Sequence, residues 1–234
     1  MLFNIEKCKV MHLGYNNPKA DYVMDGSVLQ CVSEEKNLGV IVSDDFKWER
    51  QCCEAVKKGN RIKLLGMIKR NFTDRSQSTL IPLYKSLVRP HLKYWCSVWN
   101  PHFRKDIELI EGVQRRATKL VKDVEHLHYN DRLEHLGLMC LHTRRIRSDL
   151  IDTYKIINGI YNVKTELFYD YDQIGRRGHS KKLFKRRSRL NIRKFAFSNR
   201  VVDRWNSFSE CCITCNSINC FKSHISSKLE PETT

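Results

Sequence analysis

The sequence lacks any apolar run of the length that a membrane-spanning helix needs. Such a helix requires about 18 or more consecutive apolar residues, and no segment of this 234-residue chain reaches that length. The amino-terminal residues do not form a signal peptide either, because Glu6, Lys7 and Lys9 interrupt the stretch that would have to be apolar. The sequence therefore predicts an intracellular protein without a membrane partner.

Acidic residues are scarce relative to basic ones. The chain has 42 Lys and Arg against 26 Asp and Glu, a formal net charge of +16 at pH 7. Such a surplus repels itself unless an anionic partner lies nearby, and nucleic acid is the commonest partner of this kind. Residues 1–50 hold six basic and eight acidic residues, a net −2, so the rest of the chain carries +18. This shift in composition predicts two modules.

The ten cysteines show no spacing that would indicate a disulfide framework, and in an intracellular protein we expect reduced thiols. Zinc prefers tetrahedral sets of Cys and His, and one such set lies within 13 residues: Cys212, Cys215, Cys220 and His224. Its order does not match the usual nucleic-acid zinc knuckle, and Cys also serves as a small buried apolar residue. The sequence favours this second interpretation, so no metal is predicted and zinc is kept as the alternative.

Motifs of hydrolases and of phosphate-binding loops are missing. No Ser-His-Asp, Cys-His or phosphate-loop pattern occurs in the chain. Four histidines cluster in sequence, but no carboxylate or cysteine spacing supports a catalytic or metal-binding role for them, and we expect structural or surface roles; they are His126, His128, His135 and His142. No small-molecule substrate is predicted.

Hydrophobic patterning predicts an α+β fold that is mostly α. The first residues predict a small antiparallel sheet of three or four strands, with Asp25-Gly26 as a hairpin turn and a buried strand at 38–42. From Trp48 onward the apolar period becomes helical. A first helix is expected at about 48–69, with Asp44 or Asp45 as N-cap. A second is expected at 80–91, ended or kinked by Pro90, with an inward stripe of Leu80, Leu83, Tyr84, Leu87, Val88 and His91. Further helices are expected at 105–121, at 142–158 with Asn158-Gly159 as its stop, and at 198–208. The polar tail is expected to be frayed.

The strongest basic run covers residues 176–194. Its Lys and Arg residues are interleaved with Leu, Phe and Ile, and no acidic residue in the run balances them. A charge run is often only a solvated face, but this alternation favours a strip that binds nucleic-acid backbone with low specificity, helped by stacking of Phe or Tyr on unpaired bases. The predicted contacts are Arg89, Lys93, Arg115, Arg116, Lys119, Arg176, Arg177, Lys181, Lys182, Arg186 and Arg187.

Five ordered segments carry a resemblance to a known family. They are FNIEKCKVMHLG at 3–14, EKNLGV at 35–40, YKSLVRPHLKY at 84–94 with VWNP at 98–101, VQRRATK at 113–119, and the basic run with NRVV at 199–202 and WN at 205–206. Each is weak alone, but their order and spacing together resemble the LINE-type (non-LTR) retrotransposon reverse transcriptases, especially the jockey-like branch. The resemblance covers nearly the whole chain.

The resemblance implies three regions. Residues 1–47 would be a palm remnant whose Leu38 and Gly39 match the primer-grip hairpin. Residues 48–125 would be a thumb-like helical bundle, and residues 126–234 a helical and basic carboxy-terminal segment that contacts template and primer. Lys7 matches a lysine just beyond the family's catalytic hairpin; in this chain we expect a solvent-facing lysine at a strand end.

The family's catalytic aspartates would lie before residue 1, together with the two magnesium ions that they hold. Asp44-Asp45 is not that pair, because Val42 stands where an aromatic residue would be and the pair leads into a helix. We therefore expect no catalytic residue, cofactor or polymerase activity in this chain, although the complete family enzyme would use Mg. The expected function is that of a truncated RNA-directed DNA polymerase fragment.

The expected partners of such a fragment are the RNA or DNA backbone and the rest of a polymerase, and the family and the charge favour nuclear residence. Two alternatives stay open. One is a domesticated transposable-element fragment that serves as a nucleic-acid-binding or protein-interaction module, and the other is a non-functional relic.

Overall fold

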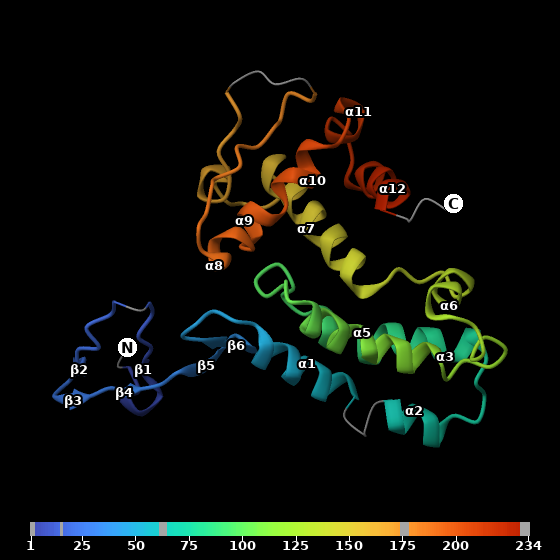
Figure 1. Ribbon diagram of the computed structural model, residues 1–234, viewed down its shortest axis with the longest axis horizontal. Coiled ribbons are helices and arrows are strands. Elements are labelled where there is room, and N and C mark those ends of the chain that lie inside the picture. The colour runs from blue at the N-terminus through green and yellow to red at the C-terminus, as the bar shows by residue number, and fades with distance from the viewer. Residues whose placement is uncertain (1–2, 15, 61–64, 174–177, 230–234) are drawn as a thin grey trace.

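The computed structural model describes residues 3–14, 16–60, 65–173 and 178–229. The fold is α+β and mostly α, as the patterning predicts. One hydrophobic core gathers residues from Val40 to Leu141, and a second gathers residues from Leu150 to Ile225. Figure 1 shows helix α7 (Leu141–Ile157) running from the first of these lobes to the second. Among the described helices, none combines the length and the apolar character needed to cross a bilayer.

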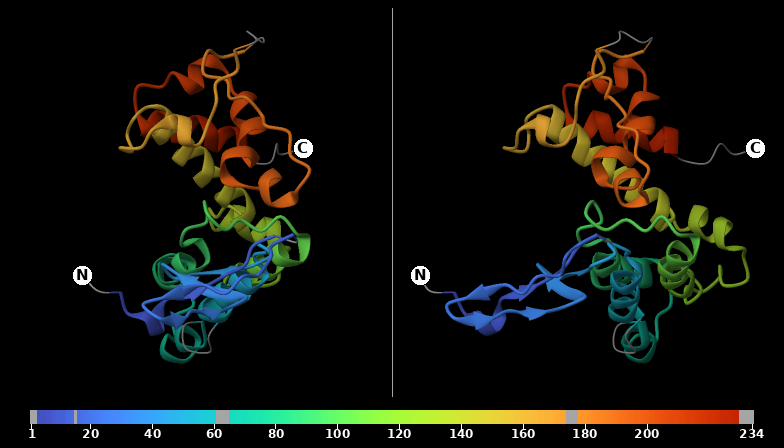
Figure 2. Two further views of the ribbon diagram at one scale, coloured as in Figure 1. Left: turned by 90° about the vertical axis from the view of Figure 1, so that its left-hand side faces the viewer. Right: turned by 60° about the vertical axis from the view of Figure 1, so that its left-hand side comes forward.

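The strands do not form the single antiparallel sheet that the sequence predicts. The structure instead has three separate pairs: β1 (Lys9–Val10) with β4 (Gln30–Cys31), β2 (Val23–Met24) with β3 (Ser27–Val28), and β5 (Glu34–Asn37) with β6 (Val40–Ser43). The β1–β4 pair is parallel. Most of these strands are only two residues long, too short to join into a wider sheet. The region projects from the helical body (Figure 2).

Two tight turns explain the hairpins. Asp25 and Gly26 both have positive φ, +49° and +75°, as a two-residue hairpin turn requires, so the predicted turn between β2 and β3 is confirmed. Leu38 and Gly39 adopt the same kind of turn between β5 and β6, with φ of +47° and +85°. The predicted strand at 38–42 therefore begins two residues later, at Val40.

The first lobe is built on helix α1 (Glu49–Asn60), which packs against α4 (Arg89–Lys93) and α5 (Arg104–Thr118). The helix expected at 48–69 is described in two parts, α1 as far as Asn60 and α2 (Leu65–Asn71). Residues 61–64, with Ile62, lie outside the described residues. The predicted N-cap is wrong. Asp45 instead accepts hydrogen bonds from the Ser43 hydroxyl and the Lys47 amide, both at 2.9 Å, and so closes the turn before α1.

A π-helical turn precedes Pro90. The chain is helical from α3 (Gln77–Leu83) through the wider turn η2 (Tyr84–Val88) into α4, so Pro90 neither ends the helix at once nor breaks it. The wider turn relieves the clash that a proline ring makes with the preceding turn. It also shifts the helical phase by one residue. His91, expected to face inward, is therefore exposed, and Leu92 is buried in its place.

A buried polar network joins α5 to α6 (Tyr129–His135), a helix that the sequence analysis did not predict. Gln114 accepts from the Tyr84 hydroxyl at 2.6 Å and donates to the Tyr129 hydroxyl at 3.0 Å. The Glu111 carboxylate accepts from the Leu141 amide at 2.9 Å. The positive end of the helix dipole stabilises a carboxylate at the first residue of α7. The network therefore fixes the start of α7.

The second lobe packs short helices around the later part of α7. They are η3 (Thr165–Leu167), α8 (Asn191–Lys194), α9 (Phe197–Arg200), α10 (Val202–Asn206), α11 (Glu210–Ile213) and α12 (Ile218–Leu229). The stop of α7 is confirmed, because Gly159 takes a φ of +66° just beyond it. The expected helix at 198–208 is divided into α9 and α10. The prediction that the tail is frayed is wrong for the residues up to Leu229. Phe221 and Ile225 are fully buried there, where α12 packs on α7.

Two arginines connect the lobes. Arg145 of α7 is buried and donates to the carbonyls of Leu92 and Trp99. Arg200 of α9 forms an ion pair with Asp149 at 2.9 Å and donates to the Ser97 carbonyl at 2.8 Å.

An apolar cavity of about 690 Å³ opens at this junction, with Trp48 and Phe103 of the first lobe and Phe168 and Phe197 of the second in its wall. The two cores divide within α7, so the predicted boundary at residue 125 does not coincide with this division.

Candidate nucleic-acid interface

Two of the predicted contact residues lie on α4 and share one face of it. Arg89 is the first residue of α4 and Lys93 the last, one turn apart. Burial lowers the pKa of both side chains, and the like charge of Arg144 on α7 lowers each pKa further. Asp152 acts on Lys93 in the opposite direction but more weakly. The structure therefore places three cations close together.

Helix α7 adds Arg144 and Arg147 to this group. The neighbouring Arg145 stacks its guanidinium over Trp99 at 4.3 Å, which holds the start of α7 against the end of α4. The Arg144 Nε atom is buried without a hydrogen-bond partner. Burial and then Arg144 lower the pKa of Arg147, whose Nε donates to the Ser226 hydroxyl at 3.0 Å.

We call Arg89, Lys93, Arg144 and Arg147 the α4–α7 cation cluster. Within the described ranges no member forms an ion pair. Arg144 and Arg147 are not among the contacts predicted from the sequence. The sequence does contain a pattern that indicates them, because residues 144–147 hold three arginines in four positions at the start of a predicted helix.

An exposed aromatic pair follows the cluster directly. Tyr94 and Trp95 are 48% and 44% exposed, and their rings stack with centroids 6.0 Å apart and planes within 10°. The Tyr94 hydroxyl donates to the Leu38 carbonyl at 3.0 Å. The tip of the β5–β6 hairpin, with the family-matched Leu38 and Gly39, therefore lies beside the end of α4. Cations next to exposed aromatic faces can hold phosphates and stack bases.

The other family-matched residue, Lys7, is exposed, as expected. It lies in η1 (Ile5–Lys7), two residues before β1, so the expected place at a strand end is wrong.

Three further predicted contacts lie at the carboxyl end of α5. Arg115, Arg116 and Lys119 are exposed there. Arg115 lies over the ring of Tyr129 in α6, 4.8 Å from its centroid.

Two residues of the basic run at 176–194 are paired with acidic residues outside it. Asp170 pairs with Arg186 at 2.6 Å, and Asp203 pairs with Lys185. Lys181 donates to the Asn158 side chain at 2.7 Å.

The remaining predicted residues of this run differ in placement. Lys182 is half-buried, and Arg187 is exposed in a groove of about 890 Å³ with Lys185, Arg186 and Lys194. Arg176 and Arg177 lie outside the described residues.

The four predicted zinc ligands separate into two groups. Cys215, Cys220 and His224 converge, whereas Cys212 is fully buried in the second core. All ten cysteines are free.

The clustered histidines do not gather into a site. His126, His128 and His135 are exposed. His142 is half-buried, and its pKa is lowered by burial and then by the charge of Arg204. These placements agree with surface and structural roles.

Comparison of the chain with protein-family models, with curated proteins and with solved structures finds no match.

Proposed function

We propose that this chain binds RNA or DNA through the phosphate backbone, with little sequence specificity, at the α4–α7 cation cluster. The observation that carries this proposal is a group of cations that act on one another and form no ion pair within the described residues, whereas Lys185 and Arg186 of the basic run are paired with carboxylates. A polyanion would supply the missing counter-charge and release its own condensed counterions. Tyr94 and Trp95 add a stacking surface for unpaired bases.

The proposal extends to ancestry. Segments 35–40 and 84–94, which resemble the primer grip and the thumb helix of LINE-type reverse transcriptases, meet through the hydrogen bond from Tyr94 to Leu38. This contact between segments far apart in sequence supports a polymerase ancestry for the chain and a retained ability to hold nucleic acid. We expect no polymerisation by the chain, and its ancestry and charge favour a nuclear location.

Binding is tested by fluorescence anisotropy with labelled single-stranded and duplex oligonucleotides over a range of salt concentrations. The logarithm of the association constant should fall linearly with the logarithm of salt, at about 0.7 per phosphate contact for single strands and about 0.9 for duplex. Arg144→Gln and Lys93→Gln should each weaken binding and reduce this slope by about one contact.

The matched controls are Lys185→Gln and Arg186→Gln. Each removes one positive charge, but that charge is already paired with Asp203 or Asp170. Equal losses in all four variants would refute the cluster as the binding site and leave only net charge. The absence of any binding at low salt would favour the relic.

A primer-extension assay tests the ancestral half of the proposal. The purified chain is given an RNA template, a DNA primer, nucleotides and magnesium. We expect no extension, and extension would show that the chain contains a complete active site.

A further inference from the structure

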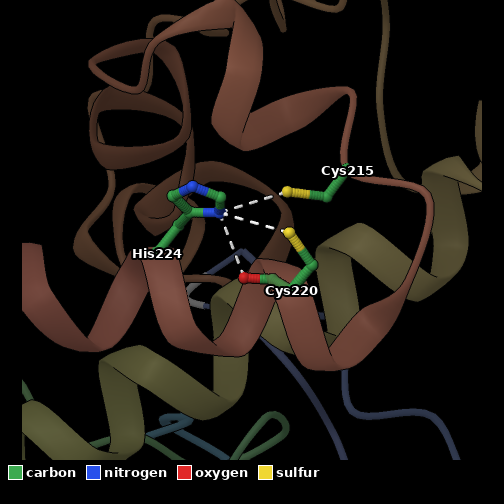
Figure 3. A group of neighbouring side chains, drawn as sticks. All are labelled: Cys215, Cys220 and His224. Carbon is green, nitrogen blue, oxygen red and sulfur yellow. Dashed lines mark hydrogen bonds between the residues drawn. The ribbon is translucent and has the colours of Figure 1, made fainter.

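We propose that Cys215, Cys220 and His224 form a zinc site that fastens the last described helix to the loop before it. Figure 3 shows the two thiols and the imidazole pointing toward one another. Their ligand atoms, the two Sγ atoms and Nδ1, all lie within 4.8 Å of one another. Among the described residues, no other group of three His, Cys, Asp or Glu side chains has this arrangement.

The distances suit a tetrahedral zinc ion. Zinc bonds of about 2.3 Å to sulfur and about 2.0–2.1 Å to nitrogen place neighbouring ligand atoms roughly 3.6 Å (S to N) and 3.8 Å (S to S) apart. The His224 Nδ1 atom lies 3.2 Å from the Cys215 sulfur and 3.6 Å from the Cys220 sulfur. Both S to N distances are therefore within a few tenths of an ångström of the tetrahedral value, and the two sulfur atoms lie within 4.8 Å of each other.

The fold holds these ligands in place. Cys220 and His224 are four residues apart on α12, so they share one face of the helix. Cys215 lies in the loop between α11 and α12, and its carbonyl accepts a hydrogen bond from the Tyr154 hydroxyl of α7. The Tyr154 ring stacks on Phe221, next to Cys220, with centroids 4.4 Å apart. One tyrosine thus positions both the loop and the helix.

The metal-free contacts are compatible with this role. The His224 Nδ1 atom lies 3.1 Å from the Cys220 carbonyl, to which it can donate while no metal is bound. In the zinc-bound form the proton would reside on Nε2, leaving Nδ1 as the ligand.

Among the described residues, three ligands converge rather than four. Cys212 is fully buried in the second core, and the exposed Cys211 thiol contacts the Ser209 hydroxyl at 3.1 Å. Neither of these two thiols supplies the fourth ligand.

The ligand chemistry selects the metal. Two thiolates and one imidazole are ligands that zinc prefers, whereas magnesium and calcium take oxygen ligands. A bound ion would close the segment from Cys215 to His224 and so stabilise the packing of α12 on α7. Zinc would then stabilise the second lobe as a structural metal, at a site separate from the α4–α7 cation cluster.

Metal analysis of the full chain, purified with reduced thiols and dialysed against trace zinc, tests the site. We expect one equivalent of zinc, and cobalt in its place should give the charge-transfer absorption of thiolate ligands. Cys220→Ser and His224→Gln should lose the bound equivalent. Cys211→Ser is the matched control, since it removes a nearby exposed thiol that is not a ligand, and it should retain zinc.

A gentler variant separates loss of the site from loss of folding. Tyr154→Phe keeps the ring stacked on Phe221 and removes only the hydrogen bond to the Cys215 carbonyl. Its zinc affinity should fall about 10-fold, the lower end of the usual effect of an outer partner. Three results would overturn the proposal: substoichiometric zinc in the wild type, zinc retained by Cys220→Ser, or a disulfide between Cys215 and Cys220 in its place.

Discussion

Single basic residues in this chain differ by what surrounds them rather than by their charge. Arg186 and Lys185 face carboxylates, while Arg89 and Lys93 face Arg144. Within the part of the chain that the structure describes, Arg89 and Lys93 form no ion pair. Surroundings also separate Arg200 from the arginines of the basic run. The ion pair of Arg200 is buried and is part of the fold, whereas those arginines are exposed.

The buried ion pair of Arg200 and Asp149 should matter far more for stability than the exposed pair of Arg186 and Asp170. The Arg200 and Asp149 side chains are 11% and 4% exposed, and removal of one partner of such a pair costs about 3–5 kcal/mol. Arg200→Leu should lower the free energy of unfolding by this amount, measured by urea denaturation. Arg186→Leu should cost at most ~1 kcal/mol. Similar losses for the two variants would contradict this difference.

A buried histidine should make the protein less stable in mild acid. His179 is 2% exposed, and burial lowers its pKa, although a contact with the Trp205 carbonyl opposes the shift. The unfolded chain, with an ordinary pKa of about 6.5, therefore binds a proton that the folded chain resists. Stability from this residue is present above about pH 6.5 and falls as the pH drops below it.

The test compares urea midpoints at neutral and mildly acidic pH. His179→Gln should flatten the dependence of the midpoint on pH. Identical pH dependence in wild type and His179→Gln would contradict the assignment.

The sequence predicts backbone conformation correctly where neighbouring residues alone determine it. Asp25-Gly26 and Gly159 were predicted because a positive φ is a property of the turn itself. Arg144 was missed because its neighbours Arg89 and Lys93 come from a helix some fifty positions earlier. Asp203 was missed as the partner of Lys185 for the same reason.

At the scale of elements, the long amphipathic helices were predictable and the short ones were not. Helices α5 and α7 begin and end close to their predicted bounds, since their apolar stripes extend over several turns. Helix α6 has only seven residues, too few to establish a period. Helix α12 could have been found, because Ile218, Phe221 and Ile225 follow helical spacing.

The β5–β6 hairpin should depend on a glycine at its tip. Gly39 has a φ of +85°, and a Cβ there would lie 3.3 Å from the Tyr94 ring. Gly39→Ala should therefore cost backbone strain and also displace the hairpin from Tyr94. Hydrogen exchange at the β5–β6 amides should accelerate, and nucleic-acid affinity should fall.

Gly14→Ala is the matched control, because Gly14 has a nearly equal φ of +87° but nothing within 4 Å of a Cβ. It should show the strain alone, without faster exchange in the hairpin. If both variants bind nucleic acid equally well, the contact with Tyr94 does not support the interface.

For the molecule as a whole, the two cores should unfold together. Trp99 is fully buried in the first core and Trp205 in the second, so fluorotryptophan labelling gives each core its own resonance. Both should reach their midpoint at the same urea concentration, because α7, Arg145 and Arg200 connect the cores. Arg145→Leu should separate the midpoints. Separate transitions in the wild type would show that the lobes are independent.

Helix α7 also limits how this chain can be rearranged. Its first residue, Leu141, completes one core, while Leu150 and Tyr154 of the same helix lie at the centre of the other. A cut before α7 would remove the helix around which the second core packs. A cut after α7 would leave the apolar face of the helix exposed on the first half. Recombination or domain grafting would therefore have to transfer α7 together with the surfaces that it packs against in both cores. The two halves are thus inherited, or engineered, as one unit.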